Sequence, residues 1–391
     1  MEIYLVGGAV RDKLMGLPVT ERDWVVVGET PDTMLKLGYQ PVGREFPVFL
    51  HPETKEEYAL ARTERKTGPG YTGFETCADP DITLEEDLLR RDLTINAMAE
   101  TPAGELVDPY GGRDDLDNGL LRHVSPAFAE DPVRILRTAR FAARFAKWGF
   151  RVAHTTNTLM RSMVDNGEVE HLVPERVWAE LAKTLATGSP ARFFTVLAAC
   201  GALRTLFPEF ISLQQDNATD GHGQAAIELA VLNQAVTLSD DITVRFAALV
   251  CDLDRGTRNG FGDGGLEALC ERQRVPNACR DLAAIALRHR KQAQVADTLT
   301  AAQLLELLNS LDAFRRPERL GQFLLVCEAD ARAGKHDFHG EYLPAALAAA
   351  QAVRAGDLQQ QGLSGREIGA ALQQKRITAI ADALSQGQPS N

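Results

Sequence analysis

Two carboxylates stand two residues apart just before an apolar, strand-like run. Glu21 and Asp23 flank Arg22 and precede residues 24–27 (WVVV). Side chains alternate along an extended strand, so both carboxylates are expected on one face. They repel each other unless a cation lies between them, and oxygen ligands of this kind suit Mg²⁺. A charged strand start that faces solvent fits the same spacing, and the pattern alone leaves both interpretations open.

A third acid is expected where two metal ions hold the attacking and leaving oxygens of a displacement. Glu57 begins the strand-like run EYALAR, which suits a strand beside WVVV. Glu64 is a less favoured alternative. Either residue is also compatible with a simple surface acid.

A glycine pair follows the apolar run IYLV and precedes a helical pattern. Gly7 and Gly8 are placed so that backbone N–H groups can approach a phosphate at a helix N-terminus, where the helix dipole also favours anions. Arg11, one turn further on, would direct a positive charge to the same place. A plain strand-to-helix turn is the alternative.

Two further segments combine arginines with acids. In RRDLTINAM, a polar start is predicted to lead into an apolar helix. Arg91 suits a phosphate clamp, and Asn96 suits contact with a loop or ribose. A helix start capped by Asp92, with the arginines in solvent, is the alternative.

In EDPVRILRTARFAARF, charged residues recur at helical spacing and are predicted to lie on one face of a helix. They are Asp131, Arg134, Arg137, Arg140, Arg144 and Lys147. A face that is simply exposed to solvent fits the same spacing. An acid and an arginine one turn apart match the donors and acceptors on the pairing edge of a base.

The elements that must position these residues change character along the chain. The first quarter alternates strand-like runs with glycine-rich turns, and from about Asp131 the periodicity is helical. The sequence thus predicts an α+β fold, with a mixed-sheet head followed by an almost entirely helical remainder. Residues 214–224 and 255–265 are predicted loops or linkers, and the final SQGQPSN a frayed tail.

Composition limits the partners. The chain has 391 residues and a formal net charge of -12, which argues against non-specific coating of nucleic acid but not against a local basic groove. Its six cysteines form no CxxC pair. No signal peptide or membrane span is predicted, so a cytoplasmic location without membrane contact is expected.

Taken together, the segments resemble a known family. LVGGAVRD, the acidic pair before WVVV, RRDLTINAM, EDPVRILR and PERVWAEL occur in the order found in class II tRNA nucleotidyltransferases and bacterial poly(A) polymerases, a branch of the polymerase β-like superfamily. The resemblance is strong over the first half of the chain and looser beyond. It implies a catalytic head at 1–125, a nucleotide-selecting neck at 126–190, a body at 191–300 and a tRNA-binding tail at 301–391.

The resemblance also implies a reaction. The tRNA 3′-hydroxyl would attack the α-phosphate of CTP or ATP with two Mg²⁺ ions assisting, and pyrophosphate would leave, so that CCA is added without a template. By position, Gly8 and Arg11 would contact the triphosphate, and Glu21 with Asp23 would bind metal. Arg91, Arg137 and Arg140 would contact the nucleotide, Asp131 and Arg134 would read its base, and residues 64–75 would help to switch from C to A.

Two departures from the family stand out. Glu21 occupies a position where the family usually has Asp. In the body, VCDLDRG (residues 250–256) replaces a His-Asp phosphohydrolase signature resembling CHDLGKG, with Cys251 at the histidine and Glu228 near where another histidine would align. Phosphodiesterase and phosphatase activity are therefore not expected.

Rival functions remain. A poly(A) polymerase shares the head motifs but usually has a basic extension, which this chain lacks. An enzyme that adds only CC or only A is a second alternative. A third is an RNA-binding protein with an inactive head, which the intact Asp23, Arg91 and EDPVR segment disfavour.

Overall fold

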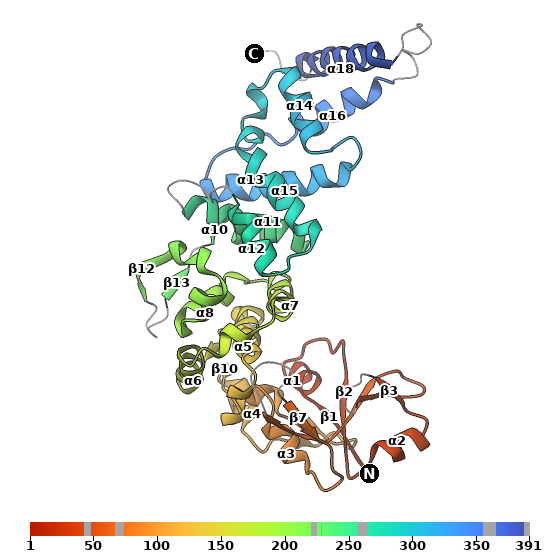
Figure 1. Ribbon diagram of the computed structural model, residues 1–391, viewed down its shortest axis with the longest axis vertical. Coiled ribbons are helices and arrows are strands. Elements are labelled where there is room, and N and C mark those ends of the chain that lie inside the picture. The colour runs from red at the N-terminus through yellow and green to blue at the C-terminus, as the bar shows by residue number, and fades with distance from the viewer. Residues whose placement is uncertain are drawn as a thin grey trace. The chain divides into compact units, whose positions relative to one another are not determined.

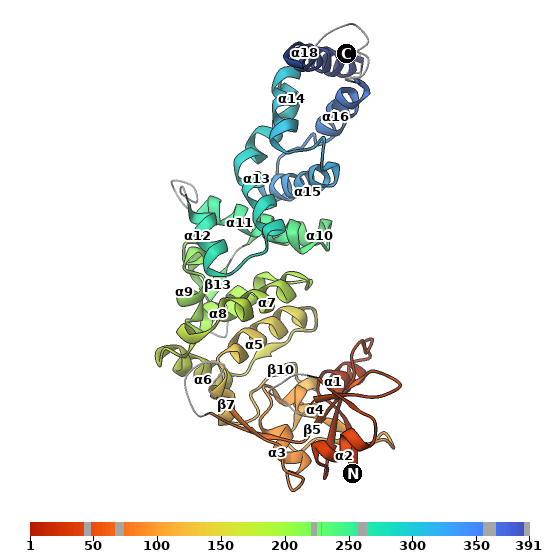
Figure 2. The same ribbon diagram turned by 45° about the vertical axis from the view of Figure 1, so that its right-hand side comes forward.

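The computed structural model describes residues 1–42, 48–66, 74–219, 225–227, 229–256, 264–354 and 365–386, without the side chains of 64–66, 74–76, 212–219, 225–227, 256, 365–366 and 386. The chain divides into two compact units, Met1–Ile227 and Glu228–Asn391. Figures 1 and 2 show the strands gathered in the first unit and helices throughout the second. The predicted α+β character is thus confirmed.

A seven-stranded mixed sheet forms the base of the first unit, in the order β3-β4-β5-β2-β1-β8-β9. Strands β2 and β5 run parallel, whereas the other neighbouring strands are antiparallel. Its strands are β1 (Glu2–Val6), β2 (Asp23–Val27), β3 (Gln40–Val42), β4 (Val48–Leu50), β5 (Glu57–Leu60), β8 (Ala99–Glu100) and β9 (Leu106–Val107). Separate strand pairs are β6 (Thr63–Lys66) with β7 (Phe74–Cys77), and β10 (Leu120–Leu121) with β11 (Arg151–Val152).

Alternation along β2 sorts its side chains into two cores. Val25 packs with Val6 and Leu88 on one face, while Val26 packs with Met34 and Leu60 on the other. Both faces are therefore covered by apolar side chains, which explains the nearly continuous hydrophobic run. The same alternation puts Asp23 on the face of Val25.

Short helices connect these strands, and longer ones build the rest of the first unit. Threonines cap α2 and α3 through side-chain bonds to backbone N–H groups, with a full capping box between Thr83 and Glu86. Helix α5 packs against α7 and α8. The helices are α1 (Gly8–Leu14), α2 (Pro31–Lys36), α3 (Leu84–Leu89), α4 (Gly112–Asp117), α5 (Val133–Arg144), α6 (His154–Asp165), α7 (Pro174–Leu185), α8 (Ala191–Cys200) and α9 (Ala202–Leu206), with 3-10 turns η1 (Thr94–Asn96), η2 (Pro126–Glu130), η3 (Ala146–Trp148), η4 (Glu168–His171) and η5 (Pro208–Leu213).

The segment RRDLTINAM is not the start of an apolar helix, and that prediction was wrong. Helix α3 ends at Leu89, Arg90 is its C-cap, and only the 3-10 turn η1 follows before β8. Asp92 accepts from the backbone N–H of Leu93 at 2.8 Å, and Thr94 donates to Asp115 at 2.7 Å. The Asp92 side chain bonds to the neighbouring backbone and so competes with the helix, and Thr94 is bonded to the distant Asp115, which together explain the irregular path.

Gly112 allows the close packing of α4 on η1. A Cβ at this position would lie 2.3 Å from the carbonyl oxygen of Thr94 and 2.8 Å from Cγ of Met98. We expect Gly112→Ala to lower the free energy of unfolding by about 2–3 kcal/mol, because backbone must shift to admit the methyl group. Thermal unfolding followed by circular dichroism measures it. Gly188→Ala, where a Cβ would meet nothing within 4 Å, is the control, and an equal loss in both variants would contradict the explanation.

In the described residues of the second unit, the regular secondary structure is all helical. Helices α10, α11, α13 and α15 pack around one another, and α14, α16 and α18 form a further group. Their bounds are α10 (Ala230–Leu238), α11 (Ile242–Gly256), α12 (Gly265–Arg272), α13 (Asn277–Ala293), η6 (Ala296–Thr298), α14 (Ala301–Ser310), α15 (Pro317–Gly334), α16 (Tyr342–Ala352) and α18 (Gly365–Gln386).

The two predicted loops and the predicted tail need correction at their edges. Within 214–224, residues 214–219 form β12 (Gln214–Thr219), which pairs with β13 (Ala225–Ile227), because backbone pairing does not require apolar alternation. Residues 220–224 lie outside the described part of the chain. Within 255–265, α11 continues to Gly256 and α12 begins at Gly265. In the predicted tail, Ser385 and Gln386 still belong to α18.

No helix in the described ranges is long and apolar enough to cross a bilayer.

Candidate active site

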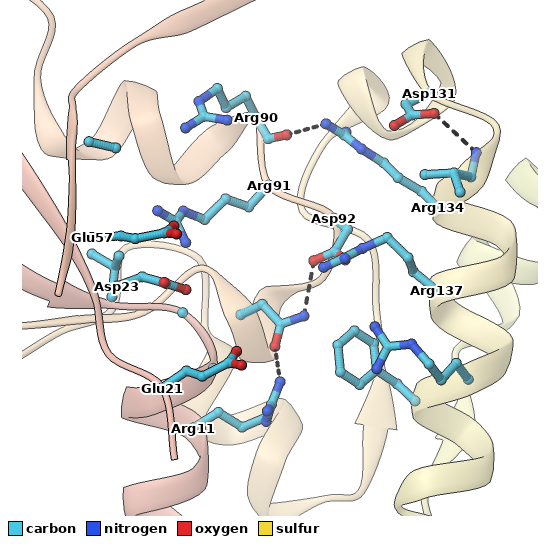
Figure 3. A pocket seen from close by; sticks show the side chains of 18 of the residues that line it. Arg11, Glu21, Asp23, Glu57, Arg90, Arg91, Asp92, Asp131, Arg134 and Arg137 are labelled. Carbon is cyan, nitrogen blue, oxygen red and sulfur yellow. Dashed lines mark hydrogen bonds and ion pairs between the residues drawn. The ribbon is translucent and has the colours of Figure 1, made fainter. Parts of the chain in front are cut away.

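Asp23 and Glu57 are register neighbours on the two parallel central strands. Asp23 opens β2 and pairs with Glu57, which opens β5, and Val6 at the end of β1 lies opposite Asp23. Figure 3 shows both carboxylates pointing into one cleft, with Glu21 on the segment before β2. The strand arrangement predicted for Glu57 is confirmed. Glu64 lies in β6, but its side chain is outside the described residues.

Burial is the main influence on the ionisation of Asp23. Burial raises the pKa of Asp23, the Arg91 guanidinium lowers it, and the Glu21 carboxylate raises it further, so that the net shift is upward. Within the described residues no three acidic, histidine or cysteine side chains already form a closed metal cage. Mg²⁺ is commonly held by one or two carboxylates together with waters and substrate phosphates, and an open acidic pair of this kind fits that chemistry.

The glycine turn brings the backbone close to Arg91. Gly7 has a φ of 69°, and a Cβ there would lie 2.9 Å from Nη1 of Arg91. Gly8 begins α1, and Arg11, one turn later, lines the same cleft while nearly buried. The left-handed conformation and the close approach together explain why glycine is needed at position 7.

A chain of hydrogen bonds links this turn to helix α5. Arg11 donates to Oδ1 of Asn96, and Nδ2 of Asn96 donates to Asp92 at 3.0 Å (Figure 3). Nε of Arg137 donates to Oδ2 of Asp92 at 2.7 Å. At the other end, Arg144 donates to Asp12, which also accepts from Arg11. The arginines of α1 and α5 are thereby held in one network.

Asp92 anchors that network and should make it sensitive to acid. Burial alone would raise the pKa of Asp92, but Arg137 and the Asn96 amide outweigh burial and hold it well below the usual value. A depressed pKa stabilises the fold above about pH 4, and the contribution is lost as pH falls through the folded-state pKa.

We expect Asp92→Asn to lower the free energy of unfolding at pH 7 by about 2–3 kcal/mol, because it leaves Arg137 without its buried counter-ion, while the partial exposure of Arg137 screens part of the loss. Below pH 4 the difference from the unmodified chain should shrink progressively, because the unfolded chain binds a proton at Asp92 there, whereas the folded chain takes it up only at lower pH. Urea unfolding at a series of pH values measures both effects. A difference that does not change with pH would rule out the ionised carboxylate as its source.

The two predicted base-reading residues lie at the start of α5 and are held in place. Nη1 of Arg134 donates to the carbonyl of Ala127 at 2.8 Å, and Nη2 donates to the carbonyl of Arg90 at 2.6 Å (Figure 3). Asp131 receives both Nη groups of Arg176, at 3.0 and 2.7 Å, and the backbone N–H of Val133 at 3.1 Å. In the described contacts Oδ2 of Asp131 accepts only from Arg176, which leaves it a lone pair for a further donor.

Helix α7 supplies residues that sequence reasoning missed. Arg176, Glu180 and Lys183 line the cleft, and Glu180 accepts from Nε of Arg140 at 2.5 Å. Their spacing of four and three residues places them on one helical face, which was the available signal. The segment PERVWAEL had served only to support the resemblance. Arg62 on the segment after β5 was also missed.

The residues predicted to bind metal, contact the triphosphate and read the base meet in one cleft of about 780 Å³. Ten basic side chains and six carboxylates line it, so the cleft is basic although the chain is acidic. The basic ones are Arg11, Arg62, Arg90, Arg91, Arg134, Arg137, Arg140, Arg144, Arg176 and Lys183. Of the six charged residues predicted to lie on one helical face, five therefore line the cleft: Asp131, Arg134, Arg137, Arg140 and Arg144. Lys147 is not among the lining residues, and its ammonium instead lies 4.0 Å from the ring centre of Trp148.

Comparisons with known proteins agree with this arrangement. The family description "Poly A polymerase head domain" matches residues 3–122, and "Probable RNA and SrmB- binding site of polymerase A" matches residues 149–213. A "Multifunctional CCA protein" of Thioalkalivibrio sulfidiphilus is 56% identical over 97% of this chain and 98% of its own length. Another with the same name, from Nitrosococcus oceani, is 54% identical over 98% and 99%.

Solved structures show the same fold. The CCA-adding enzyme of Bacillus stearothermophilus in complex with CTP has a TM-score of 0.65 at 21% identity, covering 97% of this chain and 89% of that one. A CCA-adding enzyme in complex with ATP has a TM-score of 0.65 at 19% identity, covering 100% and 92%. With two relatives more than half identical over nearly their full length, the chain belongs to the multifunctional CCA proteins, a family of CCA tRNA nucleotidyltransferases among the class II CCA-adding enzymes and poly(A) polymerases.

Proposed function

We propose that the cleft of the first unit is where this chain adds CCA to the 3′ end of tRNA, from CTP and ATP and with release of pyrophosphate. The proposal rests on one observation: the acidic pair Glu21 and Asp23 and the pair Asp131 and Arg134 line the same basic cleft. The first suits transfer of a nucleotide and the second suits choice of its base. The names of the relatives and of the CTP and ATP complexes support the same substrates.

Mg²⁺ fits the acidic residues at the head of β2. Glu21 and Asp23 would hold the metal, and Glu57 in register beside Asp23 would complete the acidic group. Two bound Mg²⁺ ions would supply charge neutralisation at the triphosphate and promote ionisation of the tRNA 3′-hydroxyl. Glu21 reaches one methylene further than the usual Asp, so Asp23 is the principal ligand in this proposal.

The arginines would position the triphosphate, so that the 3′-hydroxyl meets the α-phosphate in line. Gly8 offers a backbone N–H at the start of α1, and Arg11 and Arg91 lie on either side of the glycine turn. Arg137 and Arg140 would contact the nucleotide further along α5. Positioning and charge stabilisation account for most of the catalysis in nucleotidyl transfer of this kind.

The selection of C and A would depend on Asp131 and Arg134. Cytosine and adenine each present an amino-group donor next to a ring-nitrogen acceptor, and uracil and guanine present the reverse order. The carboxylate of Asp131, held by Arg176, would accept from the amino group. Arg134 would donate to the ring nitrogen. Residues 64–75 would assist the change from C to A; 67–73 lie outside the described part of that segment.

The direct test uses the purified full chain with Mg²⁺ and tRNA that lacks its terminal CCA. We expect two additions with CTP alone and a third only when ATP is also present, resolved at single-nucleotide length. No extension would refute the proposal and leave RNA binding as the surviving function. Addition of C only, or of A only, would assign a narrower enzyme.

A poly(A) polymerase is the second candidate, since residues 3–122 match the head domain described for such enzymes. It predicts long adenylate tails in the same assay. The closely similar relatives are named for CCA instead, which favours the first proposal.

We expect no phosphodiesterase or phosphatase activity from the second unit. Asp252 accepts from the backbone N–H groups of Val231 and Leu232, and burial raises its pKa to about 6. Burial also raises the pKa of the Cys251 thiol to about 12, so the metal-binding thiolate is disfavoured, and Arg290 pairs with Asp254. Glu228 lies outside the described residues. Turnover of bis-p-nitrophenyl phosphate or p-nitrophenyl phosphate above background, with Mg²⁺, Mn²⁺ or Ni²⁺ present, would contradict this expectation.

We also propose a separate role for each of four segments of the chain. Residues 1–125 would form the catalytic head, 126–190 the nucleotide-selecting neck, 191–300 the body and 301–391 the tRNA-binding tail. A reducing, cytoplasmic location is supported by six cysteines that are all free, five of them buried.

A further inference from the structure

The ring of Phe141 lies among three of the arginines assigned to the nucleotide, one of which, Arg11, also lies 5.1 Å from the ring centre of Phe145. Phe141 on α5 lines the cleft and is nearly buried. The guanidinium carbon of Arg140 lies 4.3 Å from its ring centre, that of Arg11 5.1 Å, and that of Arg137 5.7 Å. All three distances are within the range of a cation–π contact, about 6 Å.

Each of these arginines is also fixed at its edge by an acid. Arg11 pairs with Asp12 at 2.8 Å, Arg137 with Asp92 at 2.7 Å, and Arg140 with Glu180 at 2.5 Å. A guanidinium is planar, with N–H donors around its edge and none on its faces. The acids therefore fix the direction of the edges, whereas the ring contacts fix the positions of the charges relative to one another.

We infer that Phe141 is a positioning residue for nucleotide binding. Its ring holds Arg11, Arg137 and Arg140 in place, so that they form a triphosphate-binding site before the nucleotide arrives. The inference rests on the proposed function. Three like charges in a partly desolvated cleft repel one another, and the negative face of an aromatic ring offsets that repulsion. Arg11 comes from α1 and the others from α5, so the ring also couples the glycine turn to the base-selecting helix.

This role differs from simple core filling in what it requires of the ring. Core filling depends on the shape of Phe141, whereas cation–π attraction depends on the charge distribution over the ring. Fluorine atoms on the ring withdraw that charge with little change of shape. Affinity for the triphosphate should therefore fall with each added fluorine, because less ordered arginines lose more conformational entropy when the nucleotide binds. The rate of the chemical step should be nearly unchanged.

The test replaces Phe141 in the full chain by mono-, di- and trifluorophenylalanine. We expect KM for CTP to rise in steps to about tenfold for the trifluoro form, with kcat within about twofold and an unfolding temperature lowered by no more than a few degrees. The same series at Phe194 is the matched control: this residue is fully buried in the same unit, stacks on Phe210 at 4.4 Å, and its described ring contacts are with other phenylalanines.

The outcomes separate this inference from the proposed function. A constant KM across the Phe141 series, or a KM that rises only together with loss of folded protein, would overturn the inference. Lack of nucleotide addition by the unmodified chain would instead refute the proposed function. Calorimetric titration of CTP into the same variants does not depend on catalysis, and equal affinities there would also overturn the inference.

Discussion

Replacing Asp23 by Asn should reduce CCA addition by roughly 10³-fold or more, equivalent to about 4 kcal/mol of transition-state stabilisation. Asp23 opens β2 beside Glu57, and its carboxylate carries the charge that would hold Mg²⁺. The amide has nearly the same shape but no charge, so the fold should be retained. Single-turnover addition of one C to tRNA measures the effect.

Several variants sharpen this test. Asp32→Asn on the exposed surface of α2, outside the cleft, should leave the rate unchanged. Glu21→Asp, which keeps the carboxylate and shortens the side chain by one methylene, should retain activity, whereas Glu21→Gln should lose it in part. tRNA affinity, measured by filter binding, should be the same for all. If Asp23→Asn kept most of its rate, the metal site would have to be sought elsewhere.

The sequence could predict side-chain directions in the head but not the sheet that brings them together. Alternation along a strand is a property of the backbone, so Asp23 was expected on the same side as Glu21. The pairing of Asp23 with Glu57 depends on β2 and β5 being parallel neighbours, which requires contacts between distant segments. The local pattern suggested such a pairing but could not establish its register.

The helical part of the cleft shows a different limit. Spacing puts Arg176 and Glu180 on one face of α7, but spacing does not say whether that face meets solvent or a cleft. The packing of α7 on α5 decides it, and it places Glu180 beside Arg140. Spacing alone likewise left the charged residues of α5 compatible with a solvent-exposed face, whereas the structure buries Arg134 and Arg140.

The largest effect on base choice is expected from Asp131→Asn. Arg176 donates to both side-chain oxygens of Asp131 in the structure, so the oxygen of the new amide should remain with Arg176 and its NH₂ group should turn toward the base. The amino groups of C and A would then meet a donor instead of an acceptor. An unsatisfied pair of donors costs a few kcal/mol, so kcat/KM for CTP and ATP should fall by about 100-fold.

The fall should be selective, and that is what distinguishes base reading from a structural role. Uracil presents a carbonyl where cytosine presents an amino group, so incorporation of UTP should fall much less and discrimination between CTP and UTP should narrow. It should not invert, because Arg134 still donates toward a ring position where uracil carries N–H. Competition between the two nucleotides on the same tRNA measures the ratio directly.

Two controls test the part played by Arg176. Asp114→Asn on the exposed surface of α4 should leave both nucleotides unaffected. Arg176→Met removes the two hydrogen bonds to Asp131 but keeps an unbranched side chain of moderate length. Adding Asp131→Asn to this variant should change the discrimination between CTP and UTP less than it does in the chain with Arg176 intact. Without Arg176, the new amide is free to turn either way. If Asp131→Asn lowered CTP and UTP incorporation equally, Asp131 would be holding α5 in place through Arg176 instead of reading the base.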